Sequence, residues 1–402
     1  MVPGLMPEVL SSSKIFLAGK MAGKPHLEIR ARMGRFLRNV LATPMSRLFR
    51  AQIREQQDLD AYRGLVHQAF YAEPFRPWVC TDVLMGGQWH AAGALPPTKS
   101  PARRERDNAV HHYGHDVILK RAAALPLVGQ PLPFLLEHGV NFSDQAGFEV
   151  PKPWVRSYLC MGEQRAARIR RLYGVDAVAV GPYIQYAHSL LSEQRGSALK
   201  EQLGRSLLVI PAHSVDQVQR SWSDEALIGL VERHRRQQGF DTVIWQGFWK
   251  DEPPSNLLPP GWILAGNGHR SNPWFLDCQR TLLELCDAML TFALGTHVGY
   301  ALALQRRVLF AGLELKQDVS GAEEEWKERY LEEARERQRL IKELGVDLAR
   351  GGLTLLDSVQ AKAVLDPWFG FDRELAPQAL RAALRATSAH ERKRSPVGAS
   401  PA

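Results

Sequence analysis

The alternation of apolar and polar positions is clearest between Asn272 and Phe310, where helical and strand periods follow one another within about forty residues. In its first part, apolar residues recur at helical spacing and three charged residues occupy the opposite face. In order, the pattern predicts a helix from Phe275 to Cys286 with Asp277, Arg280 and Glu284 on its polar face, a buried strand over Ala288–Phe292, a helix through Val298, and a strand over Arg307–Phe310.

Shorter apolar runs upstream continue the same alternation of strands and helices. Such alternation is typical of open, mostly parallel sheets with helices on both faces. The expected fold class is therefore α/β, with two Rossmann-like doubly wound domains facing a cleft. The predicted strands are Leu132–Leu136, Val155–Cys160, Ala177–Val180, Leu207–Pro211, Thr242–Gln246 and Trp262–Ala265, and the predicted helices are Glu163–Tyr173, Ser192–Gly204 and Asp224–Arg236.

A chain of 402 residues exceeds what one ordinary core accommodates, so we expect more than one domain. The polar helix after residue 191 is the predicted link between two of them. We expect a basic amphipathic segment at 1–60, a first Rossmann-like domain at 61–195, a second at 196–375, and a C-terminal helix with a disordered tail at 376–402.

The composition is that of a globular protein, with 45% hydrophobic and 23% charged residues. Four cysteines without any CxxC pair predict neither a disulfide framework nor a thiolate metal site, which favours a reducing cytoplasm. We find no apolar run approaching the ~18 residues of a spanning helix, and no signal-peptide core. The net charge of +8 and the pI near 9.4 favour anionic partners.

Basic residues concentrate near the N-terminus, where residues 1–60 hold ten Lys and Arg against five Asp and Glu. Arginines alternate with apolar residues over 27–54, and Pro44 divides this stretch into two short predicted amphipathic helices. Two interpretations stay open. The stretch binds an anionic membrane surface, which makes the protein peripheral at the inner membrane, or it packs on the first domain with its arginines in water.

Polar residues that directly follow predicted strands are the candidates for chemistry, because ligands of doubly wound sheets collect at the carboxyl ends of strands. Three of these groups contain histidine, the side chain best suited to exchange a proton near neutral pH. A glycine and a hydroxyl at a helix N-terminus also favour an anion. The groups are Glu137-His138-Gly139, Gly181-Pro182-Tyr183, His213-Ser214 and Gly295-Thr296-His297, and His269 and Arg270 follow another strand.

Each candidate also has a structural interpretation. His138 fits a general base, or a buried histidine bonded to a carbonyl. His213 and Ser214 fit a phosphate contact, or a polar turn. Thr296 fits an anion site, or a helix N-cap that uses the same geometry. Arg270 fits a phosphate or sugar carboxylate partner, or a solvated loop residue.

Several familiar motifs are excluded. Gly19–Lys24 has the wrong spacing for a phosphate loop, and the sequence contains neither G-x-G-x-x-G nor G-x-S-x-G, which weakens dehydrogenase and serine hydrolase interpretations. His111, His112 and His115 match no known ligand spacing, so we expect a surface cluster and predict no metal and no cofactor. The absence of zinc-finger spacing or an RNP-like strand argues against a nucleic-acid module.

Four short motifs in order resemble the GT-B glycosyltransferases of bacterial capsule and surface-polysaccharide gene clusters. They are EHG at Glu137, VGPYI at Val180, PAHS at Pro211 and GTHVGYAL at Gly295, and the resemblance covers roughly Pro131 to Gly312. It implies a nucleotide-sugar donor held by 196–375, a saccharide or lipid-linked acceptor offered by 61–195, and metal-independent transfer in the cleft between them.

The resemblance also implies roles for the candidate residues. His138, assisted by Glu137, is the expected catalytic base, and Gly139 and Tyr183 lie on the acceptor side. The donor-binding residues are His213, Ser214, His269, Arg270, Gly295, Thr296 and His297.

Other functions remain open on the sequence alone. A phosphoalcohol (glycerophosphate) transferase or a nucleotide-sugar epimerase would use the same scaffold. A protein that binds anionic lipid or nucleic acid would explain the basic first sixty residues, although no nucleic-acid partner is predicted from the motifs.

Overall fold

The structure is a computed structural model, which describes residues 112–125, 132, 134–143, 157–213, 218–248, 251, 254, 256–267, 274–349 and 351–389. The chain divides into two compact units, Met1–Arg54 and Glu55–Ala402, and every described residue belongs to the second. The predicted basic segment at 1–60 and the tail beyond residue 389 lie outside the described residues. The proposed boundaries at 60, 195 and 375 stay predictions.

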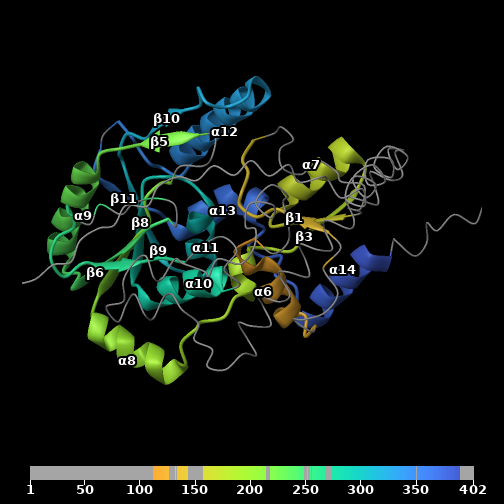
Figure 1. Cartoon of the computed structure of the whole chain (residues 1–402), viewed down its shortest axis with the longest axis horizontal. Helices are drawn as coiled ribbons and strands as arrows, with labels where there is room; N and C mark the ends of the chain where they lie inside the picture. The colour runs from red at the N-terminus through yellow and green to blue at the C-terminus, as the bar shows by residue number, and fades with distance from the viewer. Residues whose placement is uncertain are drawn as a thin grey trace, which may run out of the picture. The chain divides into compact units, whose positions relative to one another are not determined.

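A six-stranded sheet, which we call the large sheet, forms the centre of the described part (Figure 1). All of its neighbouring strands pair in parallel except the antiparallel edge pair β11–β9. In spatial order the strands are β11 (Leu353–Leu355), β9 (Arg307–Ala311), β8 (Ala288–Thr291), β4 (Ser206–Val209), β6 (Thr242–Gln246) and β7 (Ile263–Ala265).

Both faces of the large sheet are covered, which explains why β4 and β8 are buried at every position and are mostly apolar. Leu208 and Met289 face a core built with α8 (Glu193–Leu203), α10 (Phe275–Leu285) and α11 (Thr296–Ala303). Their neighbours Leu207 and Leu290 face the opposite core, built with α9 (Asp224–Gln238). Successive strand residues point to opposite faces, so a strand buried on both sides cannot alternate with polar residues.

A second, three-stranded parallel sheet, the small sheet, precedes the large one in the chain. It contains β1 (Leu135–Leu136), β2 (Ser157–Cys160) and β3 (Asp176–Ala179), with α7 (Glu163–Tyr173) connecting the last two. The helix α6 (His115–Ala122) follows the short turn η1 (His112–Gly114), and η2 (Tyr183–Tyr186) leads towards α8.

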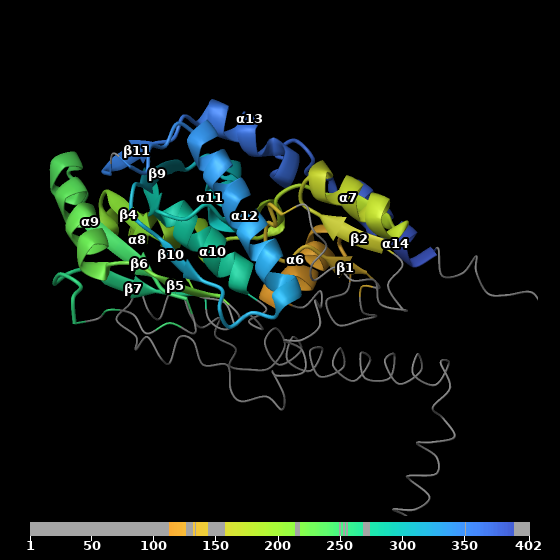
Figure 2. The ribbon, with the colours of Figure 1, turned by 90° about the horizontal axis from the view of Figure 1, so that it is seen from above.

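The C-terminal helices return to the small sheet (Figure 2). After α12 (Glu324–Glu343), α13 (Ser358–Phe369) packs against α7 and α11, and α14 (Pro377–Ala389) packs against α6. The backbone of α13 lies directly against Gly162, because a Cβ added there would lie 2.3 Å from the backbone carbonyl carbon of Trp368. A two-stranded antiparallel ribbon of β5 (Gln219–Ser221) and β10 (Lys316–Asp318) completes the described strands.

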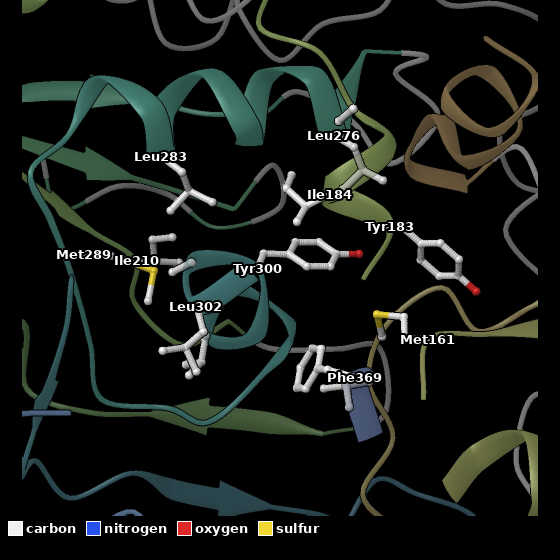
Figure 3. Packing of buried hydrophobic residues seen from close by; sticks show 14 of the residues in the cluster. Met161, Tyr183, Ile184, Ile210, Leu276, Leu283, Met289, Tyr300, Leu302 and Phe369 are labelled. Atoms are coloured by element: carbon white, nitrogen blue, oxygen red, sulfur yellow. The ribbon is translucent and has the colours of Figure 1, made fainter. Parts of the chain in front are cut away.

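One core cluster contains residues from both sheets and from the returning helices. Figure 3 shows this cluster, to which Ile184 of η2, Tyr300 of α11 and Phe369 of α13 contribute. Gly299 admits Phe369, since a Cβ there would lie 2.0 Å from its ring. The N–H of Leu375 also donates to the Tyr186 hydroxyl at 2.9 Å. The small and large sheets are therefore joined by a continuous apolar core.

The predicted fold class is confirmed, since the described residues form parallel Rossmann-like α/β sheets with helices on both faces of the larger one. Two expectations about exposure are wrong. Asp277, predicted on a polar helix face, is buried because Arg121 pairs with it. His112 and His115, predicted in a surface cluster, are buried in the turn before α6 and at the first residue of α6, respectively. Among the described helices, none combines the length and the apolar character that crossing a membrane requires.

Candidate functional site

The strand order of the large sheet contains a topological switch point between β4 and β8. From β4 the chain first builds outward through β6 and β7, and then returns to the other side of β4 with β8 and β9. The loops that leave the carboxyl ends of β4 and β8 therefore diverge, and ligands of such sheets bind where they part. His213 lies in the first loop, and Gly295 ends the second.

The second loop leads directly into α11, which begins at Thr296 with Gly295 as its N-cap residue. Within the described part of the chain, no side chain caps this helix, so its first N–H groups point to the switch point. Gly295, Thr296 and His297 are all half-buried. The turn is therefore partly open to solvent, as an anion site requires.

His297 folds back over the turn. Its Nε2 lies 2.9 Å from the Thr291 hydroxyl, and a Cβ added at Gly295 would lie 3.1 Å from its Cε1. Burial lowers the pKa of His297 to about 4, the charge of Arg337 lowers it further, and a hydrogen bond to the Ala293 carbonyl opposes the shift. The imidazole is neutral at pH 7 and fills the space that a glycine at 295 leaves free.

His213 lies beside His297, on the opposite loop. Its ring stacks on Phe248 at a centroid distance of 4.3 Å and an interplanar angle of 23°. Burial lowers its pKa to about 3, and electrostatic interactions with Arg220, His297 and Arg337 act in the same direction. Histidines from both diverging loops are thus close enough to interact electrostatically at the switch point, and their predicted roles in donor binding stay predictions.

Two arginines that the sequence analysis did not select share this site. Arg220 of β5 donates from Nη1 to the carbonyl of His213 at 3.0 Å. Burial lowers its pKa to about 10, and the nearby charge of Arg337 contributes in the same direction. Arg337 of α12 forms an ion pair with Glu333 at 2.7 Å. The switch point therefore carries two guanidinium groups, and Glu333 acts electrostatically on both of them.

The spacing along α12 could have revealed Arg337. Arg329, Glu333 and Arg337 are four residues apart, so they share one helix face, and the first two are less than a tenth exposed. The sequence predicts this mixed-charge stretch, Glu323–Glu343, as helix-forming with an acidic start, without selecting any of its residues for the site. Arg220 gave no comparable signal, because a three-residue ribbon strand shows no periodicity.

The loop after β1 belongs to the small sheet and is braced by Glu137. One carboxylate oxygen accepts from the N–H of Asn141 at 3.3 Å and the other from that of Met161 at 3.0 Å. The side chain is only 2% exposed, and its charge contributes to raising the pKa of Tyr183 and of Tyr300. These contacts fix the shape of the loop that carries His138. A direct part of Glu137 in proton transfer stays a prediction.

A hydrogen bond across the two sheets brings this loop to the switch point. The N–H of Val140 donates to the Thr296 hydroxyl at 2.9 Å, and a Cβ added at Gly139 would lie 3.4 Å from the same oxygen. His138, half-buried, stands one residue before Gly139 and stacks on Tyr113 at 5.9 Å. The predicted base and the predicted anion-binding turn are thus neighbours.

The remaining predicted residues are distributed as follows. Tyr183, expected on the acceptor side, is fully buried and donates its hydroxyl proton to the Leu159 carbonyl at 3.0 Å, so its side chain belongs to the core below the site. Ser214, His269 and Arg270 lie outside the described residues. No group of three or more His, Cys, Asp or Glu side chains that could hold a metal occurs within the described residues.

Comparisons with known proteins identify no family. No protein-family model and no curated protein matches the chain. UGT2 of Phytolacca americana, solved with UDP-2-fluoroglucose and pterostilbene, aligns at 12% identity over 58% of this chain and 50% of its own, with a TM-score of 0.28. TcCGT1, solved with UDP, aligns at 11% identity over 60% and 56%, with a TM-score of 0.30.

The apo form of the Phytolacca protein gives 13% identity over 61% of this chain and 53% of its own, with a TM-score of 0.27. This chain therefore spans about half the length of the solved structures that it matches. Similarity at this level carries no argument about activity, so the fold assignment depends on the sheet topology described above.

Proposed function

We propose that this protein is a GT-B glycosyltransferase, which moves a sugar from a nucleotide-sugar donor to a hydroxyl of a saccharide or lipid-linked acceptor in bacterial surface polysaccharide synthesis. The observation that carries the proposal is the Val140–Thr296 hydrogen bond, because it holds the His138 loop against the open helix N-terminus at the switch point. A proton acceptor and an anion-stabilising site are thereby adjacent, which is the arrangement that glycosyl transfer needs.

On the donor side, negative charge develops on the phosphate as the sugar leaves. That negative charge is stabilised by the N–H groups of the first turn of α11 and by the guanidinium groups of Arg220 and Arg337. These groups are held in place before the reaction begins, so they need not reorient. Neutral His213 can donate a hydrogen bond to the phosphate without carrying a charge, whereas the single N–H of neutral His297 is engaged by the Ala293 carbonyl. We assign the same side to Ser214, His269 and Arg270 as a prediction. This set of donors supplies charge without requiring a metal ion.

On the acceptor side, His138 is the proposed general base, and Gly139 leaves room for the acceptor. The acceptor oxygen forms a bond to the anomeric carbon while the bond from that carbon to the phosphate oxygen breaks. The electron pair goes to the phosphate and the hydroxyl proton goes to His138. Glu137 holds the loop in place through its two backbone contacts.

Nucleotide binding tests the donor site directly. We expect UDP, GDP, CDP or CMP to raise the thermal midpoint of the wild type, and Arg337→Gln to weaken that nucleotide's binding about tenfold, as the loss of one charge-assisted contact predicts. Arg337→Lys, which retains the charge, controls for folding. Arg339→Gln is the matched control, since Arg339 lies on the same helix but pairs with Glu336 and Glu343 near the surface.

The proposal fails if no nucleotide binds, or if Arg337→Gln binds as tightly as the wild type. Product analysis then separates the alternatives, because only a glycosyltransferase forms a new glycosidic bond to an acceptor. A phosphodiester product would indicate a phosphoalcohol transferase, and an isomerised nucleotide-sugar an epimerase. Sedimentation of the full chain with anionic vesicles tests the predicted membrane contact of residues 27–54.

A further inference from the structure

Tyr113 has a backbone conformation that bulky residues rarely adopt, with φ of 56° and ψ of 17°. Among the described residues, the other non-glycine residues with positive φ are Ala124 and Gln305. Side chains larger than Asn or Asp are uncommon in this left-handed region, and retained strain of this kind clusters at functional sites. The question is what holds Tyr113 there.

The other two residues have an ordinary explanation, because each directly follows the C-cap of a helix. At Ala124 the backbone N–H donates to Arg121 at 3.0 Å, and at Gln305 it donates to Leu302 at 3.1 Å, which closes α6 and α11 with left-handed residues. Both are exposed. Tyr113 ends no such helix, since it lies in the turn before α6 and is half-buried.

Ring contacts define the surroundings of Tyr113. Its phenol ring stacks on His138 with a centroid distance of 5.9 Å and an interplanar angle of 20°. Phe275 of α10 meets the same phenol ring edge-on at 4.7 Å. Tyr113 therefore connects the loop of the small sheet to a helix of the large sheet through side-chain ring contacts.

Contacts of the residues on either side of Tyr113 hold the backbone turn in place. Gly114 is also left-handed, with φ of 71°, and the Nδ1 of His115 lies 2.5 Å from the carbonyl oxygen of His112. The ring of His112 meets His138 at 5.8 Å and 79°. His138 is thus contacted by one ring nearly parallel to its own plane and by another nearly perpendicular to it.

We infer that Tyr113 is a positioning residue for His138, and that its strained backbone is retained because it places the phenol ring beside the imidazole and nearly parallel to it. Parallel and perpendicular neighbours together restrict rotation of the imidazole about its side-chain bonds. This inference rests on the proposed function, in which His138 accepts the acceptor proton. A base that turns away from the reacting oxygen loses rate without loss of donor binding.

Three substitutions separate the ring from the strain. Tyr113→Phe keeps both, Tyr113→Ala removes the ring and keeps the strain, and Tyr113→Gly removes both. We expect kcat within about threefold of wild type for Phe and a loss of about 10- to 100-fold for Ala and Gly, with the donor KM unchanged. The Gly variant should melt about 1 to 3 °C above the Ala variant, because glycine adopts positive φ without strain.

Gln305→Gly is the matched control, since it relieves the same backbone strain at an exposed helix end. It should raise the thermal midpoint without changing kcat. A further readout does not need turnover: in histidine-labelled protein, the NMR signal of the His138 ring, assigned with His138→Gln, should keep its ring-current shift in Tyr113→Phe and lose it in Tyr113→Ala and Tyr113→Gly.

Retention of kcat within threefold in the Ala and Gly variants, or an unchanged His138 signal in them, would overturn the inference. A Gly variant less stable than the Ala variant would show that Tyr113 is not strained, with the same consequence. If the wild type turns over no nucleotide-sugar, the proposed function fails, whereas the NMR and melting experiments still decide whether Tyr113 positions His138.

Discussion

The small and large sheets place their functional loops by different means. In the large sheet, successive strands and helices are neighbours in the chain, and the switch point between β4 and β8 follows from strand order. The small sheet has strands of only two and four residues, and one of its faces has a small core of its own. Its other face packs into the core shared with the large sheet.

Contacts from distant parts of the chain therefore hold the small sheet and its loop in place. Arg121 of α6 forms a bidentate pair with Asp277 of α10, at 2.6 Å and 3.0 Å. Arg280 of the same helix donates to carbonyls of η2 and of the residue that follows it, among them that of Ala187 at 2.9 Å. The turn proposed to bind an anion therefore follows from the strand order of one sheet, whereas the position of His138 depends on how the two sheets pack.

The largest effect should come from the ion pair between α6 and α10. Asp277→Ala leaves Arg121 without its partner and removes the acceptor of the His188 N–H, which lies 2.8 Å away, so we expect a loss of about 3 to 5 kcal/mol in the free energy of unfolding. Chemical denaturation measures this loss. Hydrogen exchange should show faster opening over 157–186 than over 206–246.

Glu284→Ala is the control for that variant, because Glu284 forms a partly exposed pair with Arg280 on the same helix. Its effect should stay below about 1 kcal/mol. If Asp277→Ala accelerated hydrogen exchange equally in both sheets, the small sheet would not depend on this ion pair more than the large sheet does.

A smaller effect is expected at the contact between α7 and α13. Gly162→Ala places a methyl group within 2.5 Å of backbone atoms of Pro367 and Trp368, which cannot yield as a flexible side chain can. We expect a loss of about 1 to 3 kcal/mol from overpacking, measured by denaturation. Gly321→Ala, where an added Cβ meets nothing within 4 Å, should be close to neutral. A stable Gly162→Ala variant would contradict the close packing of α13 on the small sheet.

The smallest effect concerns pH and is specific to the small-sheet side. Burial lowers the pKa of His115 to about 3, so the folded protein keeps it neutral where the unfolded chain, with a pKa near 6.5, binds a proton. The contribution of His115 to the free energy of unfolding is therefore fully present above pH 6.5. It falls as the pH drops towards 3, by at most about 1.4 kcal/mol per pH unit.

His115→Asn retains a donor for the His112 carbonyl and cannot titrate. Denaturation at pH 7, 6 and 5 should show that the free energy of unfolding falls less steeply with decreasing pH in this variant than in the wild type. The difference in slope should correspond to the uptake of up to one proton on unfolding. Identical slopes would mean that His115 is already protonated in the folded protein.

Most helices and strands of the large sheet were predictable because each depends on local periodicity. Phe275–Leu285, Ala288–Thr291 and Arg307–Ala311 lie within one residue of their predicted bounds. The helix α6 was not predicted, since its residues from His115 to Lys120 are all buried and include the ion pair of Asp116 with Lys120. A helix that is buried on every side lacks the apolar and polar faces by which a helix is predicted from sequence. Its charged residues are instead typical of an exposed segment.

The sequence by itself determined which residues form the buried parallel strands, and hence that His138, His213 and Gly295 follow strand ends, because side-chain period and turn composition are local properties. Only the tertiary structure decided that Val140 meets Thr296, 156 residues away, and that Arg220 and Arg337 join the histidines at the switch point. The tertiary structure likewise decided that Asp277 is buried and that the rings of Tyr113 and His138 are neighbours. These pairings depend on how two cores merge, and the free energy of that packing is spread over many contacts that no local pattern contains.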